Sequence, residues 1–348
     1  MVAIEEGLVG RASDTGGDMS EAIGDHAEGR KISTMEDLSS MVKLASLLCL
    51  IFISPWTASA DLTMFTVFQI GKQSMTRLRN THTIVTVNGQ YPGPTIYVNE
   101  GDNLIVQVEN NEPYNVTIPW HGVKQLISHW VDGAAYITEW PINVRSIFDY
   151  NFTITGQVGT LWWHADISYE RATVHGALVI LPRAGNDYPF PKPDAEFPII
   201  LGEWWNANVE DMVAGSIPSD LDAYTINDTT RIWVERGKTY LLRIINAAMI
   251  NHSSVFKIAQ HNMTVVAVDV VYTKPYTTDM LVIQPGSTMD VLITANYIGT
   301  RVLNSQAVGT GSFNTSATTI LQYEGNSSES SFLQQSQAFS LVFNSVGN

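Results

Sequence analysis

Residues 96–101 read Ile-Tyr-Val-Asn-Glu-Gly, and 136 positions later residues 232–237 read Ile-Trp-Val-Glu-Arg-Gly. After each glycine, apolar residues occupy alternate positions up to an asparagine, Asn110 in the first case and Asn246 in the second. Alternation with a period of two on either side of a glycine predicts two strands joined by a turn. The chain therefore reads as two copies of one β unit, each about 120–140 residues long.

A second match, between Gly159-Thr160 and Gly299-Thr300, supports this repeat at an offset of 140 residues. Val, Ile, Thr and aromatic residues recur in short runs, which turn sequences such as Asn88-Gly89 interrupt. We therefore expect an all-β chain of two β-sandwich domains. The expected parts are domain one at 61–182, a Pro-rich linker at 183–195, domain two at 196–324 and a Ser-, Asn- and Gln-rich tail at 325–348.

The first 60 residues indicate export. An apolar run at 44–53 follows Lys43 and precedes the small residues Ala58-Ser59-Ala60, as in a secretory signal at 41–60. Ten apolar residues are too few to span a bilayer, which takes about 20, so we expect no transmembrane segment. The acidic leader at 1–40 is best explained as a gene-model artefact, with Met41 as the true start.

Charge and cysteine content narrow the function classes. The net charge is −15, whereas a nucleic-acid partner needs a basic face, so nucleic acid is not an expected partner. The only cysteine, Cys49, lies inside the expected signal, which leaves the mature chain without a disulfide or a thiolate metal ligand. Seven Asn-x-Ser/Thr sequons follow, as in a secreted glycoprotein. They begin at Asn115, Asn151, Asn227, Asn251, Asn262, Asn314 and Asn326.

Two short segments carry the candidate chemistry. His121 and His164 each lie one residue away from completing a His-x-His pair, because Pro119 and Asp166 occupy the second position. Two imidazoles at this spacing on a strand point to the same sheet face and can bind a metal together. Pro119 has no donor atom, and a carboxylate is a harder ligand that suits copper less well than imidazole.

Nine motifs spread over residues 63–324 resemble the first two domains of a plant laccase, a multicopper oxidase. They are 88–95 (NGQYPGPT), 120–125 (WHGVKQ), 130–133 (WVDG), 136–138 (YIT), 150–153 (YNFT), 171–178 (RATVHGAL), 200–205 (ILGEWW), 240–243 (YLLR) and 271–275 (VYTKP). The resemblance implies cupredoxin-like Greek-key β-sandwiches, copper as cofactor, and secretion to the plant apoplast or cell wall. It also implies oxidation of small phenols, including lignin precursors, coupled to reduction of oxygen to water.

The departures from the family pattern argue against that activity. By family match, His121 and His164 are type 3 copper ligands, while Pro119 replaces a type 2 ligand and Asp166 another type 3 ligand. Trp140 stands where the family has a disulfide cysteine, and His129 replaces a small residue. The family's third domain, which carries the thiolate copper and further cluster ligands, has no counterpart in this sequence.

Three hypotheses therefore stay open. In the first, the chain is a copper-dependent, laccase-like phenol oxidase of the cell wall, whose activity is lost or impaired unless a separate chain supplies the third domain. Alternatively it is a non-catalytic cell-wall glycoprotein, or a non-functional truncated remnant of a laccase. A chain without the third domain exposes an apolar interface, which invites a covering partner.

Overall fold

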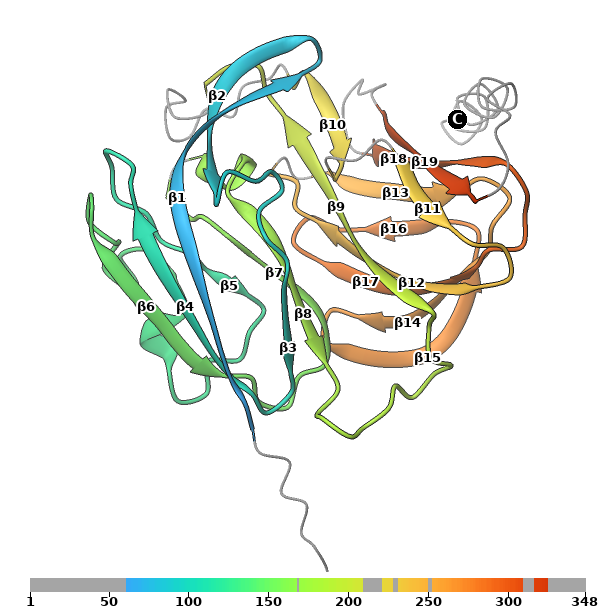
Figure 1. Cartoon of the computed structure of the whole chain (residues 1–348), viewed down its shortest axis with the longest axis horizontal. Helices are drawn as coiled ribbons and strands as arrows, with labels where there is room; N and C mark the ends of the chain where they lie inside the picture. Colours follow the sequence, from blue (N-terminus) through green and yellow to red (C-terminus); the bar gives the residue numbers. More distant parts are fainter. Residues whose placement is uncertain are drawn as a thin grey trace, which may run out of the picture. The chain divides into compact units, whose positions relative to one another are not determined.

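The computed structural model describes residues 61–167, 169–208, 221–227, 231–249, 252–308 and 316–324. The expected leader, signal and tail lie outside the described residues. Within them the chain forms four β-sheets, and its helical content is two short 3-10 turns, η1 (His129–Val131) and η2 (Glu170–Ala172) (Figure 1). The predicted all-β class is confirmed.

The first sandwich consists of two four-stranded sheets. One has the order β2-β1-β4-β6 and the other the order β3-β8-β7-β5. The strands are β1 (Thr63–Arg77), β2 (Asn80–Val87), β3 (Ile96–Asn99), β4 (Asn103–Asn110), β5 (Trp120–His121), β6 (Ile147–Thr153), β7 (Gly159–His164) and β8 (His175–Leu181). Inward-facing side chains such as Phe68, Leu104 and Trp163 are fully buried and form the core between the sheets.

The second sandwich has a six-stranded sheet, β10-β9-β12-β17-β14-β15, and a five-stranded sheet, β11-β19-β18-β13-β16. Its strands are β9 (Ala195–Trp204), β10 (Ala223–Ile226), β11 (Arg231–Val234), β12 (Thr239–Asn246), β13 (Ser253–Ile258), β14 (Met263–Val268), β15 (Val271–Thr278), β16 (Leu281–Ile283), β17 (Thr288–Thr294), β18 (Thr300–Val308) and β19 (Ser316–Tyr323). Leu242, Ile244 and Phe256 lie in a separate core between these sheets.

The internal repeat is confirmed in three dimensions. Strand β3 pairs in parallel with β8, and its counterpart β11 pairs in parallel with β19. The glycine after each strand has positive φ, +96° at Gly101 and +88° at Gly237. Asn110 and Asn246 are both buried, and each side-chain Oδ1 accepts the backbone N–H two residues further on. The same local hydrogen bonds therefore end the second strand of both units.

Strand β7 is buried on both faces, because the second sandwich covers the face that turns away from the first core. The Thr288 hydroxyl donates to the Thr160 carbonyl (2.6 Å), and the Thr160 N–H donates to the Asp269 carbonyl (3.3 Å). A side chain at Gly159 would place its Cβ 2.6 Å from that Asp269 oxygen. Trp162 packs in an apolar cluster with residues of β8, β9 and β12. Glycine at position 159 thus permits the close approach of the two sandwiches.

Arg243 on β12 lies at the centre of this contact and is 1% exposed. Its guanidinium donates to Asp290 (2.8 Å) on β17, to Glu196 (2.9 Å) on β9 and to the Thr160 hydroxyl (2.9 Å) of the first sandwich. Thr160 in turn donates to the other oxygen of Asp290 (2.5 Å). Removing one partner from such a buried network leaves an uncompensated charge, which is far less favourable than losing a surface ion pair.

We therefore expect Arg243→Leu to lower the free energy of unfolding by about 3–5 kcal/mol, because Asp290 and Glu196 lose their buried counter-charge. Denaturant unfolding of the purified chain measures this change. The matched control is Lys238→Leu, which removes an exposed ion pair with Glu235 (2.7 Å) and should change stability little. Equal losses in the two variants would contradict a central role for the Arg243 network.

Candidate metal centre

Strands β5 and β7 bring the two candidate ligands together. The strands pair antiparallel, with Trp120 opposite Trp163 and His121 opposite Trp162. Because side chains alternate along a strand, Trp120 and Trp163 point into the first core, while His121, Trp162 and His164 lie on the opposite face. The spacing argument applied to each segment alone, and it is the strand pairing that makes His121 and His164 neighbours on one face.

The two imidazoles are in direct contact. His121 Nδ1 lies 3.3 Å from His164 Nε2, and the ring centroids are 5.5 Å apart. His164 Nδ1 lies 2.8 Å from the Ala165 carbonyl oxygen, to which it donates, so the lone pair of His164 is on Nε2 and faces His121. The other side of His121 stacks on Trp162 at 5.1 Å between centroids.

The surroundings of both imidazoles favour the neutral form, which is the form that binds metals. Burial lowers the pKa of His164 to about 3, and the positive charge of Arg171 adds to this effect. Burial likewise lowers the pKa of His121, again with a contribution from Arg171. His164 is therefore neutral across the physiological pH range, whereas His121 remains accessible to solvent.

The substituted positions do not complete a metal site. Pro119 contributes only its backbone carbonyl, which accepts the His164 N–H at 3.2 Å. Asp166 is exposed. In the part of the chain that the structure describes, no three His, Cys, Asp or Glu residues are placed to hold one metal ion.

The nitrogen spacing itself suits a shared metal ion. Two imidazoles bound at about 2.0–2.1 Å and at a roughly tetrahedral angle have nitrogens about 3.3 Å apart. Copper sites in proteins need further strong ligands beyond two imidazoles. The described residues therefore provide part of a copper site and do not fit a complete one.

A third histidine on the same face has a structural role. His175 lies opposite His164 across the β7–β8 pair and is buried. Its Nδ1 donates to the Arg171 carbonyl oxygen at 2.8 Å, and burial lowers its pKa to about 4. His175 is therefore a hydrogen-bonded structural histidine. Four aromatic residues, Trp162, Trp163, Trp204 and Trp205, are buried as well.

Sequence reasoning missed the part that Gly286 plays in the site. Gly286 of the second sandwich lies against His121, and a Cβ at this glycine would be 3.3 Å from His121 Nε2. Its backbone carbonyl also accepts the Trp162 indole N–H at 3.1 Å. No local signal marks Gly286, since its role depends on the docking of the two sandwiches.

A buried carboxyl group supports the segment before β5. The Tyr150 hydroxyl donates to Glu139 (2.8 Å) and accepts the Ile118 N–H (3.0 Å). Burial raises the pKa of Glu139 to about 7, with the nearby charge of Asp132 acting in the same direction. This chain of hydrogen bonds helps to hold the backbone that leads to His121.

Cupredoxin-like β-sandwiches with adjacent imidazoles on one sheet face define a class of copper protein. Two consecutive parts of the chain, residues 69–185 and 195–326, match family models described as multicopper oxidase. The chain belongs to the multicopper oxidase family, whose cofactor is copper.

Similar proteins include plant laccases. The chain is 50% identical over 268 residues to "Laccase-12" of Oryza sativa subsp. japonica, a match that covers 71% of this chain and 46% of the rice protein. It is 49% identical over 245 residues to "Laccase-4" of Arabidopsis thaliana, covering 66% of this chain and 44% of that protein. The chain thus spans about half the length of the curated relatives it matches.

Solved structures agree with this assignment. The laccase from Botrytis aclada superposes with a TM-score of 0.67 at 29% identity, over 77% of this chain and 54% of that chain. Fet3p, a multicopper oxidase that functions in iron import, gives a TM-score of 0.68 at 27% identity, over 76% of this chain and 53% of that chain. Two cupredoxin-like sandwiches are covered in each case.

The raised pKa of Glu139 makes stability depend on pH. Below the ordinary pKa of 4.5 the carboxyl is protonated in both the folded and unfolded chains, and its favourable contribution is complete. That contribution is lost as pH rises through about 7, where the folded chain ionises. We expect Glu139→Gln to remove a decline on the order of 2 kcal/mol in unfolding free energy over this range.

Urea unfolding of both chains at several pH values measures this difference. Glutamine keeps an acceptor for Tyr150 but cannot ionise, so it isolates the charge. Parallel pH profiles for the two proteins would show that Glu139 ionises as readily in the folded chain as in the unfolded one.

Proposed function

We propose that this chain is a secreted, laccase-like glycoprotein of the plant apoplast or cell wall, in which the copper-dependent oxidation of phenols is lost or impaired. The observation that carries the proposal is the pair His121 and His164, joined by a direct 3.3 Å contact and without a third ligand in the described residues. The family fold is kept, while the donor set for its cofactor is reduced.

The chemistry of the family explains why two imidazoles are not enough. Reduction of oxygen to water takes four electrons, and a multicopper oxidase supplies them through several coppers held mainly by imidazole and one thiolate. Pro119 removes one donor, and the sequence contains a single cysteine, Cys49, which belongs to the proposed signal. Oxidation of small phenols would therefore need ligands from outside the described residues.

Without a complete set of metal ligands, the site residues have a structural role. Ala165 holds the His164 tautomer, Trp162 supports the His121 ring, and His121 Nδ1 gives the buried His164 Nε2 a hydrogen-bond partner. The alternative functions, a non-catalytic cell-wall glycoprotein or a non-functional remnant, are favoured by Pro119, which cannot be a side-chain ligand.

The decisive measurement is copper per chain, by elemental analysis of protein secreted from a coding sequence that begins at Met41. We expect less than about a tenth of a copper per wild-type chain, because two imidazoles are too few for a stable site. Replacing Pro119 and Asp166 with histidine restores both His-x-His pairs and should raise the copper content. His164→Ala in that variant should lower the content again.

Stoichiometric copper in the wild-type protein, lost on changing His121 or His164, would overturn the proposal. Oxidation of a simple phenol by the same preparation would overturn it independently of the copper analysis. Asp166→Ala is the matched control, because an exposed carboxylate outside the site should not change either result.

We further propose a partner for an apolar surface on the first sandwich. Within residues 126–144, Ile137 is 85% exposed, Trp140 82% and Ile127 81%, and Leu126, Trp130 and Tyr136 are also exposed. Large exposed apolar side chains that gather in one segment are typical of a binding surface in a soluble protein. Because the relatives are about twice as long, the proposed partner is a further cupredoxin-like sandwich, on this or another polypeptide.

Replacing Ile127, Ile137 and Trp140 with serine should reduce concentration-dependent self-association of the chain, because these are its three most exposed large apolar side chains among the described residues. Sedimentation velocity over a range of protein concentrations measures the change. Val271→Ser, at an exposed position on β15 of the second sandwich, is the control. Wild-type protein that stays monomeric at all concentrations and binds no cupredoxin domain would contradict the proposed interface.

The remaining parts of the proposal concern export. Among the described residues, no helix is long and apolar enough to cross a membrane. The proposed signal at 41–60 lies outside the described residues, so its cleavage before Asp61 is tested by N-terminal sequencing of secreted protein.

A further inference from the structure

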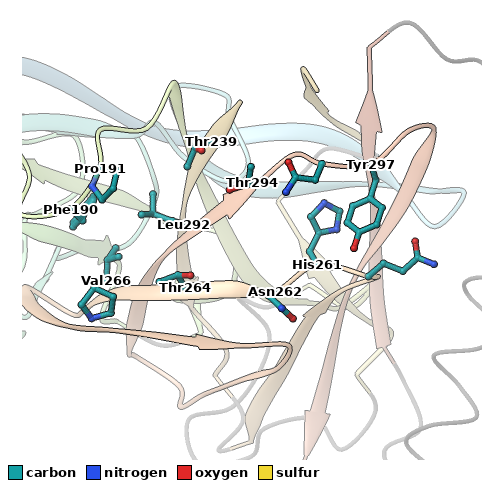
Figure 2. Close-up of a pocket in the computed structure, with 13 residues that line it drawn as sticks. Phe190, Pro191, Thr239, His261, Asn262, Thr264, Val266, Leu292, Thr294 and Tyr297 are labelled. Carbon is teal, nitrogen blue, oxygen red and sulfur yellow. The ribbon is translucent and has the colours of Figure 1, made fainter. Parts of the chain in front are cut away.

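The second sandwich carries a groove of about 490 Å³ that the copper chemistry does not use. It lies between strands β12, β14 and β17 on one side and the segments around Phe190, His261 and Tyr297 on the other. Figure 2 shows Phe190 and Pro191 at one end, Tyr297 and His261 at the other, and Leu292, Thr294 and Thr264 between them. Its volume lies in the range of small-molecule sites.

The lining of this groove is polar but uncharged. Among the described residues that form it there is no Asp, Glu, Lys or Arg. The hydrogen-bonding groups are the hydroxyls of Thr239, Thr264 and Thr294 and the amides of Gln260, Asn262 and Asn296. A neutral ligand rich in hydroxyl and amide groups matches this set, whereas an ionic ligand would lack a counter-charge.

His261 does not add a charge. Its Nε2 accepts the Tyr323 hydroxyl at 2.6 Å, and its Nδ1 donates to the Ala259 carbonyl oxygen at 2.9 Å. Burial also lowers its pKa. The ring is therefore a fixed, neutral part of the wall.

The aromatic walls are held in place by their own neighbours. Tyr297 lies between the His261 ring, 4.7 Å away, and the Arg301 guanidinium, 4.9 Å from its centroid. Phe190 stacks on Tyr188 at 4.9 Å and meets the edge of Tyr272 at 5.7 Å. Rigid aromatic faces beside hydroxyl and amide groups suit a sugar ring, which has an apolar face and polar edges.

The sequence places a sugar attachment point at this groove. Asn262 is exposed, lines the groove and begins the sequon Asn262-Met263-Thr264. Other sequons differ: both amide atoms of Asn227 are engaged, with Oδ1 accepting the Ile200 N–H (2.6 Å) and Nδ2 donating to the Pro198 carbonyl (2.9 Å). Asn151 is exposed like Asn262, but it lies on β6 of the first sandwich, does not line the groove, and accepts the Asn103 side-chain amide at its Oδ1 (2.9 Å).

We propose that Asn262 carries an N-linked glycan and that the groove holds the proximal N-acetylglucosamine rings of this glycan. This inference rests on the secretion that forms part of the proposed function. The polar groups of the groove pair with the acetamido and hydroxyl groups, and Tyr297 or Phe190 packs on a ring face. The glycan thereby fills a groove that water would otherwise occupy.

The test is site-specific removal of glycans by an amidase from the natively folded, secreted protein, followed by mass spectrometry of the resulting peptides. The Asn262 glycan should be released about tenfold more slowly than the Asn151 glycan, because an aromatic stack and one or two hydrogen bonds must open first. After denaturation the two rates should be equal.

Two variants probe the groove itself. Phe190→Ala and Tyr297→Ala each remove one aromatic wall, and either should raise the native release rate at Asn262 towards that at Asn151. Because the walls lie on different segments, a folding defect in one variant leaves the other as the test. Asn262→Gln removes the attachment point and should leave release at Asn151 unchanged.

The outcomes separate this inference from the proposed function. A glycan on Asn151 with none on Asn262, or equal native release rates at both, overturns the groove assignment and leaves secretion intact. Absence of glycan from every sequon overturns both the assignment and the secretion on which it rests.

Discussion

The burial of strand β7 on both faces is the constraint on which the rest of the structure depends. One face completes the core of the first sandwich, and the other docks on the second sandwich through Trp162, Thr160 and the Arg243–Asp290 pair. Docking requires a glycine at position 159. It also buries the Arg243 guanidinium, which is 1% exposed, among carboxylates of the second sandwich. The two sandwiches are consequently joined by directional polar contacts as well as by apolar packing, and these contacts fix how strand β7 lies on the second sandwich.

The same docking sets the chemistry of the candidate metal centre. Burial keeps His164 neutral, and the Ala165 carbonyl assigns its proton to Nδ1, whereas His121 stays accessible to solvent. These are the conditions under which an imidazole binds a metal well. The geometry is that of two adjacent imidazole donors, which Pro119 and Asp166 do not extend. The metal-binding residues can change without loss of the fold, because buried apolar and ionic contacts hold the fold together.

The candidate site was predictable from sequence only in part. His121 and His164 were identified because period-2 geometry and the family motifs mark them individually. Gly286, Arg243 and Asp290 were not identified, because each matters through a contact with a residue more than 80 positions away in the chain. The groove at Asn262 shows the same limit: the sequon is visible in the sequence, but the aromatic walls at Phe190 and Tyr297 come from distant segments.

The sequence by itself determined the all-β class, the repeated β unit and the identity of the two histidines, since these follow from local alternation, glycine turns and short motifs. Only the tertiary structure decided which atoms of the histidines meet, which polar groups are buried and where the sandwiches touch. Strand β7 illustrates the reason: every residue in Gly159–His164 is buried, so no polar alternation reveals which face meets which partner. Contacts between distant strands are set by the packing of whole sheets, which local sequence patterns do not encode.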